Sequence, residues 1–153
     1  MIIIEKLKIL TKRYGIEKIE VKKAKTGQNW LAMATQRGII IKEDITKKEI
    51  IKMVKSFEKR GYNIASDYGF LFLILHEIAH KIKHHPENWF NIQIKQIIEH
   101  GYEKYLNDEN LKNERLNLYL SQEKEAYEWA YKEYQHIKDK DLNLKNDFFI
   151  KNS

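Results

Sequence analysis

The spacing of apolar residues predicts a helix followed by several short strands at the start of the chain. In residues 2–14 apolar side chains recur every three to four positions, which is typical of an amphipathic helix, and Gly15 provides a stop. Three short runs of β-branched or aromatic residues follow and predict a small three-stranded antiparallel sheet. These runs cover residues 16–21, 30–34 and 39–41, with turns at 26–29 and 36–38.

Two helices are expected next, and the second is the most apolar segment of the chain. The first covers residues 47–60, with Asp44 or Thr46 as its N-cap. The second begins near residue 66 or 67 and runs to residue 85, where Pro86 should end it. Its first half is apolar on every side, so we expect that half to be buried, whereas its second half presents one polar face.

The C-terminal half carries weaker helical patterns. Helices are expected over 88–106 and 111–120, with breaks at Gly101 and 107–110, then over 121–138 with Ser121 as N-cap, before a loose polar tail over 139–153. Together these elements predict an α+β fold, with a small sheet packed on several helices around a central buried helix. At 153 residues, the chain is expected to form a single domain.

Composition limits the chemistry that this chain can perform. It has no cysteine, so any metal ion must be held by histidine, aspartate or glutamate side chains. The first residues lack the features of a signal peptide, and the longest apolar run is far shorter than a membrane span. We therefore expect a cytoplasmic protein that does not bind a membrane.

The net charge of +6 raises the question of nucleic-acid binding. The excess comes almost entirely from lysines spread along the chain, and the few arginines stand at 13, 37, 60 and 115. Because base recognition favours arginine, the charge allows nucleic-acid binding but does not indicate it.

Four of the six histidines stand within residues 76–85, where His76-Glu77-x-x-His80 matches the zinc-peptidase pattern H-E-x-x-H. Residues i and i+4 lie one above the other on a helix, so His76 and His80 can bind one ion. Glu77 points to an adjacent side, from which it can take a proton from a metal-bound water. His84 and His85 are expected to lie at the rim of the site.

A catalytic zinc ion needs a third protein ligand, and Glu125 is the best candidate. The small Ala126 and Ala130 beside it allow close helix packing, and Trp129 can anchor the helix to the core. Glu123 and Glu128 are the alternatives on the same helix.

The two motifs, H-E-I-A-H and the later E-A-x-x-W-A, resemble those of the ImmA/IrrE-like zinc metallopeptidases. The resemblance implies a zincin-like fold, zinc held by His76, His80 and Glu125, and Glu77 as general base. Compared with that family, residues 86–120 look like a helical insertion. Family members cut repressor-type regulatory proteins, so the resemblance implies a protein substrate of that kind.

The function expected from the sequence is therefore hydrolysis of a peptide bond by a zinc metallopeptidase. One alternative is a regulatory or nucleic-acid-associated binding module on a zincin fold, without peptidase activity. Another is a SprT-like zincin, whose third ligand would be a histidine, with only His100 and His136 available. Tyr127 and Tyr131 stand close in sequence to Glu125, but packing is their expected role.

Overall fold

The computed structural model describes residues 2, 4–85 and 89–150, and within them the fold is α+β, as expected. The helices are α1 (Ile4–Lys12), α2 (Lys47–Lys59), α3 (Gly69–Ile82), α4 (Trp89–His100), α5 (Tyr102–Asn107), α6 (Glu109–Ile137) and α7 (Asn146–Phe149), with 3₁₀ turns at Ser66–Tyr68 and Leu142–Leu144. The strands are β1 (Ile19–Lys22), β2 (Ala32–Ala34) and β3 (Ile39–Lys42). None of the helices among these residues is long and apolar enough to cross a membrane.

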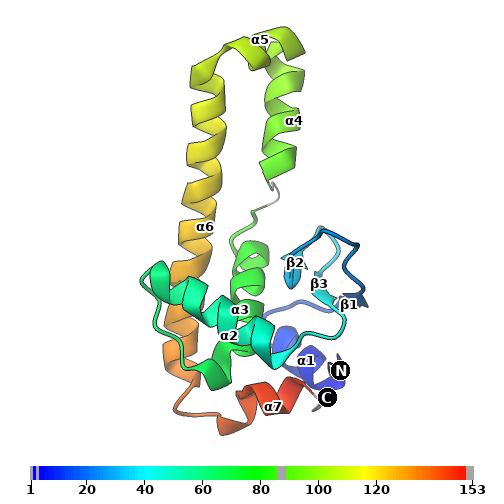
Figure 1. Ribbon diagram of the computed structural model, residues 1–153, viewed down its shortest axis with the longest axis vertical. Helices are drawn as coiled ribbons and strands as arrows, with labels where there is room; N and C mark the ends of the chain where they lie inside the picture. Colours follow the sequence, from blue (N-terminus) through cyan, green and yellow to red (C-terminus); the bar gives the residue numbers. More distant parts are fainter. Residues whose placement is uncertain (1, 3, 86–88, 151–153) are drawn as a thin grey trace.

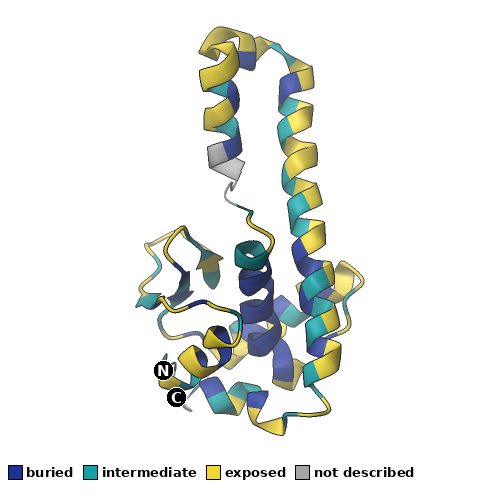
Figure 2. Ribbon diagram, turned by 180° about the vertical axis from the view of Figure 1, so that it is seen from behind, coloured by how far each residue is buried: buried dark blue, intermediate teal, exposed yellow. Residues whose placement is uncertain are grey.

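Helix α3 forms the centre of the body, with α2, α6, α7 and strand β2 packed around it (Figure 1). Every residue from Gly69 to Ala79 is buried, as the apolar pattern predicted (Figure 2). Gly69 lets α2 cross closely, because a Cβ atom there would come within 2.7 Å of methyl groups of Ile50 and Val54. A buried helix of this kind gives any side chain on its polar end a fixed position.

The sheet differs from the antiparallel one that the sequence predicted. Its order is β1-β3-β2, with β1 parallel to the central β3 and β2 antiparallel to it. A tight turn joins β2 to β3, whereas the longer connection from β1 to β2 leads from one edge of the sheet to the other. Gly38 allows the close approach of β1, because a Cβ atom there would collide with the backbone carbonyl of Lys18.

Helix α6 is one continuous helix, so the predicted break and N-cap at Ser121 are wrong. It begins after Asp108, whose carboxylate accepts the backbone N–H groups of Asn110 and Leu111. Residues 109–137 contain neither glycine nor proline, and one serine is not enough to end a helix. The breaks expected near Gly101 and residues 107–110 are confirmed by the ends of α4 and α5.

The upper half of α6 pairs with α4 and α5 to form a helical arm that extends away from the body (Figure 1). This arm contains the described part of the segment 86–120, which the sequence suggested to be an insertion. The expected stop at Pro86 lies outside the described residues, and α3 already ends at Ile82.

The C-terminal tail was expected to be loose, but residues 142–150 fold onto the body. Leu144 and Phe149 are buried, and the side chain of Asn146 accepts the backbone N–H of Phe70 at 3.1 Å. A bridge between Ile2 and Ile150 brings the two ends of the chain together. The apolar residues of the tail supply enough buried surface to hold this otherwise polar segment.

Candidate metal centre

Two histidines and one glutamate converge where the polar end of α3 meets α6. The Nε2 atom of His80 lies 2.9 Å from Oε1 of Glu123, and Nε2 of His76 lies 3.4 Å from its Oε2. One ligand atom from each of the three residues lies within 4.8 Å of the other two. This spacing allows a single cation to reach all three, so the cluster is a candidate metal centre.

Packing between the two helices sets this arrangement. Ala126 and Ala130 of α6 are fully buried, and α6 makes extensive contact with α3. The ring of Tyr127 stacks on that of His76 with the centroids 4.1 Å apart, which fixes the plane of the imidazole. Trp129, which the sequence suggested as an anchor, is partly buried and makes an edge contact with Tyr14.

The structure brings Glu123, rather than Glu125, to the histidine pair. The side chain of Glu123 is 18% exposed, whereas that of Glu125 is 50% exposed and lies 3.7 Å from His85 and 4.0 Å from Lys83. Glu123 precedes Ala126 by three residues and so lies on the same helix face as Ala126. Glu125 is the neighbour of Ala126 and is therefore rotated by about 100° from Ala126 around the helix axis. The spacing from the two alanines places Glu123 on the buried face of α6, but only the packing of α6 on α3 shows which glutamate reaches the histidines.

Glu77 lies beside the three converging residues and is held by the sheet. Its Oε2 accepts the backbone N–H of Ala34 on β2 at 2.8 Å, and its Oε1 lies 3.4 Å from Nδ1 of His76. One turn further along α3, the ammonium of Lys81 donates to the carbonyl groups of Thr35 and Gln36 at 2.6 and 3.0 Å. Helix α3 thus holds the end of β2 against the site.

Charge and burial at the site favour a cation. Burial by itself would lower the pKa of His76, but the negative charges of Glu123 and Glu77 outweigh it and raise this pKa to about 9. Burial would raise the pKa of Glu123, yet the two histidines hold it well below its usual range. The Nε2 atom of His76 is buried and makes no hydrogen bond within the described part of the chain, although Oε2 of Glu123 lies 3.4 Å away. The residues present therefore fit a divalent metal ion, which would satisfy this nitrogen.

The cluster opens into a cleft of about 770 Å³ between β2, the end of α3 and α6. The lining residues include Met33 of β2 and Tyr119 and Gln122 of α6. Burial raises the pKa of Tyr119, so its hydroxyl group stays protonated at neutral pH. Glu77 and the two histidines thus line the same cleft as this hydroxyl group.

The other candidates from the sequence lie in different settings. His84 is exposed at the cleft, and the largely buried His85 contacts His80. Tyr131 and Tyr127 belong to an aromatic cluster with Tyr62 and Phe72 in the core. The remaining three, Glu128, His100 and His136, are exposed, and none of them belongs to the cluster of His76, His80 and Glu123.

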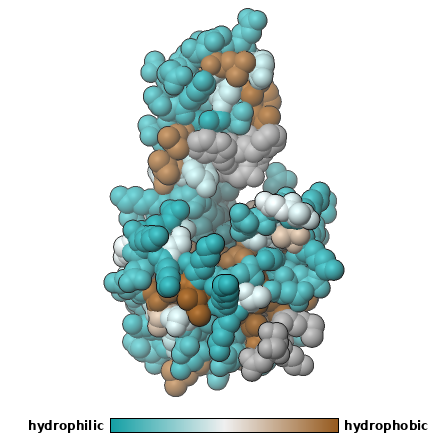
Figure 3. Space-filling model, viewed as in Figure 1, coloured by the Kyte–Doolittle hydropathy of each residue, from teal (hydrophilic) through white to brown (hydrophobic). Residues whose placement is uncertain are grey.

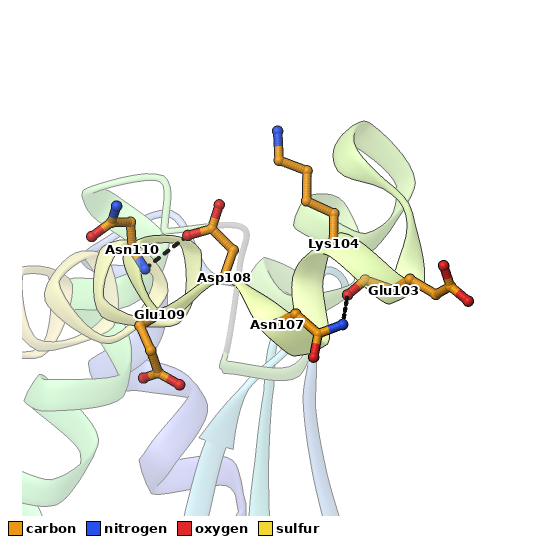
Figure 4. Close-up of a pocket in the computed structure, with 6 residues that line it drawn as sticks. All are labelled: Glu103, Lys104, Asn107, Asp108, Glu109 and Asn110. Carbon is orange, nitrogen blue, oxygen red and sulfur yellow. Dashed lines mark hydrogen bonds between the residues drawn. The ribbon is translucent and has the colours of Figure 1, made fainter.

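A second hollow of about 540 Å³ lies at the tip of the arm (Figure 4). Its side chains mainly complete the ends of α5 and α6: Asn107 donates to the carbonyl of Glu103 at 3.0 Å, and Asp108 accepts the N–H of Asn110 at 2.9 Å. The charged groups of Glu103, Lys104 and Glu109 point in different directions. This hollow therefore lacks convergent chemistry, in contrast to the cleft beside α3.

No family model matches the chain, and no curated protein or solved structure matches it significantly.

Proposed function

We propose that the chain is a zinc-dependent metallopeptidase that hydrolyses a peptide bond in a protein substrate. The observation that carries this proposal is the convergence of His76, His80 and Glu123 beside Glu77, in an open cleft. Two imidazoles and a carboxylate leave one position of a tetrahedral zinc ion open, as in catalytic zinc sites. The H-E-x-x-H pattern on a buried helix supports zinc over the other ions that such ligands accept.

His76, His80 and Glu123 would hold the ion in this site. When bound, zinc supplies Lewis acidity, which polarises a substrate carbonyl and makes a water molecule more acidic. Glu77 takes the proton of the attacking water and delivers it to the leaving nitrogen as the C–N bond breaks. The backbone N–H of Ala34 holds Oε2 of Glu77, and Oε1, which lies 3.4 Å from Nδ1 of His76, is the oxygen that we assign as the base.

Tyr119 is the tyrosine that we assign to stabilisation of the transition state. It lines the cleft with Glu77 and the histidines, and its hydroxyl group is protonated at neutral pH. A neutral hydroxyl can donate a hydrogen bond to the oxygen on which negative charge develops. Tyr127 packs against His76 instead, and we propose that it orients this ring.

The proposed fold type is zincin-like, with the motif helix beside a sheet whose edge strand β2 borders the cleft. Glu123 rather than Glu125 is the third ligand that we propose, so the resemblance to the ImmA/IrrE-like peptidases rests on the H-E-I-A-H motif. That resemblance suggests a regulatory protein as the substrate. The space between β2 and α6 suits an extended segment of polypeptide.

Metal content and cleavage of a peptide library test this function together. We expect about one zinc ion per chain by elemental analysis. Mass spectrometry should find cleaved peptides that disappear with a zinc chelator and return when zinc is added. Protein that stays free of metal after zinc is supplied would refute the proposal.

Charge distribution favours a second candidate function, binding of nucleic acid. Residues 1–60 carry 16 lysine and arginine residues against 7 acidic ones, whereas residues 61–153 carry 12 against 15. Lys48, Lys52, Lys55 and Lys59 follow one face of α2 and are exposed, without an ion-pair partner among the described residues. Figure 3 shows that the face crossed by α2 is largely hydrophilic. A row of lysines of this kind suits a phosphate backbone.

Binding of a fluorescent DNA duplex at increasing salt concentration tests this second candidate. Replacing the four α2 lysines by glutamine should weaken binding and reduce its salt dependence, because fewer counterions are released. Lys124→Gln with Lys132→Gln on α6 is the control. Equal binding by the wild type and the fourfold variant would exclude this surface.

A further inference from the structure

The second ring nitrogen of His80 has a partner that the sequence motif does not include. Nδ1 of His80 lies 3.0 Å from Nδ1 of His85, and the planes of the two rings are inclined by 63°. The side chain of His85 is only 8% exposed. The Nε2 atom of His80 faces Glu123, so the two nitrogens of this ring contact two different side chains, those of Glu123 and His85.

The end of helix α3 is built so that His85 turns back toward His80. The N–H of Lys83 donates to the carbonyl of Ala79, and the N–H of His85 donates to the carbonyl of His80 at 2.9 Å. Between them His84 has a φ of 53°, a left-handed conformation that glycine and asparagine adopt more readily. A non-glycine residue in this conformation is uncommon, and here it gives the chain the reversal that buries the ring of His85.

Glu125 lies on the far side of His85. Its Oε1 is 3.7 Å from Nε2 of His85, a distance that allows an electrostatic contact. Three groups therefore follow one another from the surface to the candidate metal centre: the carboxylate of Glu125, the ring of His85 and the ring of His80. Glu125, which the sequence suggested as a ligand, thus contacts His85, and His85 contacts the proposed ligand His80.

We propose that His85, supported by Glu125, is a positioning residue that orients the ring of His80 and keeps its Nε2 atom available to a cation. The inference rests on the metal centre proposed above. For Nε2 of a neutral His80 to bind a cation, the ring proton must be on Nδ1, and Nδ1 of His85 can accept that hydrogen bond. The proton of His85 then lies on its Nε2, facing the carboxylate of Glu125.

Two substitutions of His85 separate hydrogen bonding from packing. His85→Phe keeps an aromatic ring but removes both nitrogens, whereas His85→Asn is smaller but keeps a polar group near the place of Nδ1. We expect His85→Phe to weaken zinc binding about 10- to 100-fold and His85→Asn to weaken it less. Competition with a chromophoric chelator measures the dissociation constants, with the exposed His136→Ala as control.

Nitrogen NMR of the histidine rings gives a second readout, which does not depend on activity. In the zinc-loaded wild type, we expect a slowly exchanging proton on Nδ1 of His80, and we expect His85→Phe to lose it. The same experiment on metal-free protein should find one protonated and one bare nitrogen facing each other between the two rings.

The outcomes are distinguishable. If the wild type binds no zinc, both the metal centre and this inference fail. If the wild type binds zinc, the positioning role alone is overturned by either of two results. One is that His85→Phe binds zinc as tightly as the wild type, and the other is that it binds zinc more tightly than His85→Asn. A proton on Nδ1 of His80 that exchanges equally slowly in His85→Phe would overturn it as well.

Discussion

Replacing Glu123 by alanine is expected to remove most of the zinc from the protein. The carboxylate is the third member of the donor set, and its loss would leave two imidazoles in a cleft open to water. The affinity should fall by more than the roughly 10- to 100-fold that loss of a supporting partner costs. Elemental analysis after dialysis and competition with a chromophoric chelator measure the effect.

Glu125→Ala is the matched comparison, because it removes the same side chain two residues along the same helix. We expect this variant to keep its zinc, with an affinity lowered only through the support that Glu125 gives to His85. Glu128→Ala, at an exposed position of α6, should behave like the wild type. Zinc lost from Glu125→Ala but kept by Glu123→Ala would contradict the ligand set that we propose and favour the one suggested by the sequence.

Glu77→Gln is expected to keep the zinc and to lower peptide hydrolysis by about 10²- to 10⁴-fold, the usual contribution of a general base. Glutamine has nearly the same shape, and its amide oxygen can still accept the backbone N–H of Ala34. The variant should therefore fold and bind metal normally while it lacks a group that can take a proton. Initial rates on peptides selected from the library measure the loss.

The same preparation of Glu77→Gln supplies its own control. Zinc content and unfolding midpoint should match those of the wild type, so that lower hydrolysis cannot come from a damaged site. Cleavage at the wild-type rate by zinc-loaded Glu77→Gln would exclude Glu77 as the base. It would leave the metal centre and the hydrolytic activity intact and assign the role of base to another group.

The parts of the fold that local sequence determines were predicted well. Helix α2 begins with Thr46 as its N-cap, and the bond between Thr46 and Glu49 closes a capping box. Burial of α3 followed from its unbroken run of apolar residues. In these cases the signal lies within a few residues of the feature that it specifies, so it could be read before any tertiary contact was known.

The break expected at Ser121 was a local error, whereas two other mistaken predictions concern contacts between distant segments. The prediction of an antiparallel sheet was wrong, because β1 pairs in parallel with β3. Strand order and direction depend on the route of the loop before β2, and a short run of β-branched residues does not specify that route. The tail after residue 138 was expected to be loose because its composition is polar. Phe149 nevertheless packs against Phe70, which is far away in the sequence.

The sequence by itself determined the pairing of His76 with His80 and the place of Glu77 beside them, because a single helix fixes the geometry of residues one and four positions apart. Only the tertiary structure decided that Glu123, and not Glu125, joins the histidines, and that His85 turns back onto His80. Both outcomes depend on how α6 is rotated against α3 and on a left-handed residue after α3. Side-chain packing between helices sets that rotation, and it is a sum over many contacts that no short motif contains.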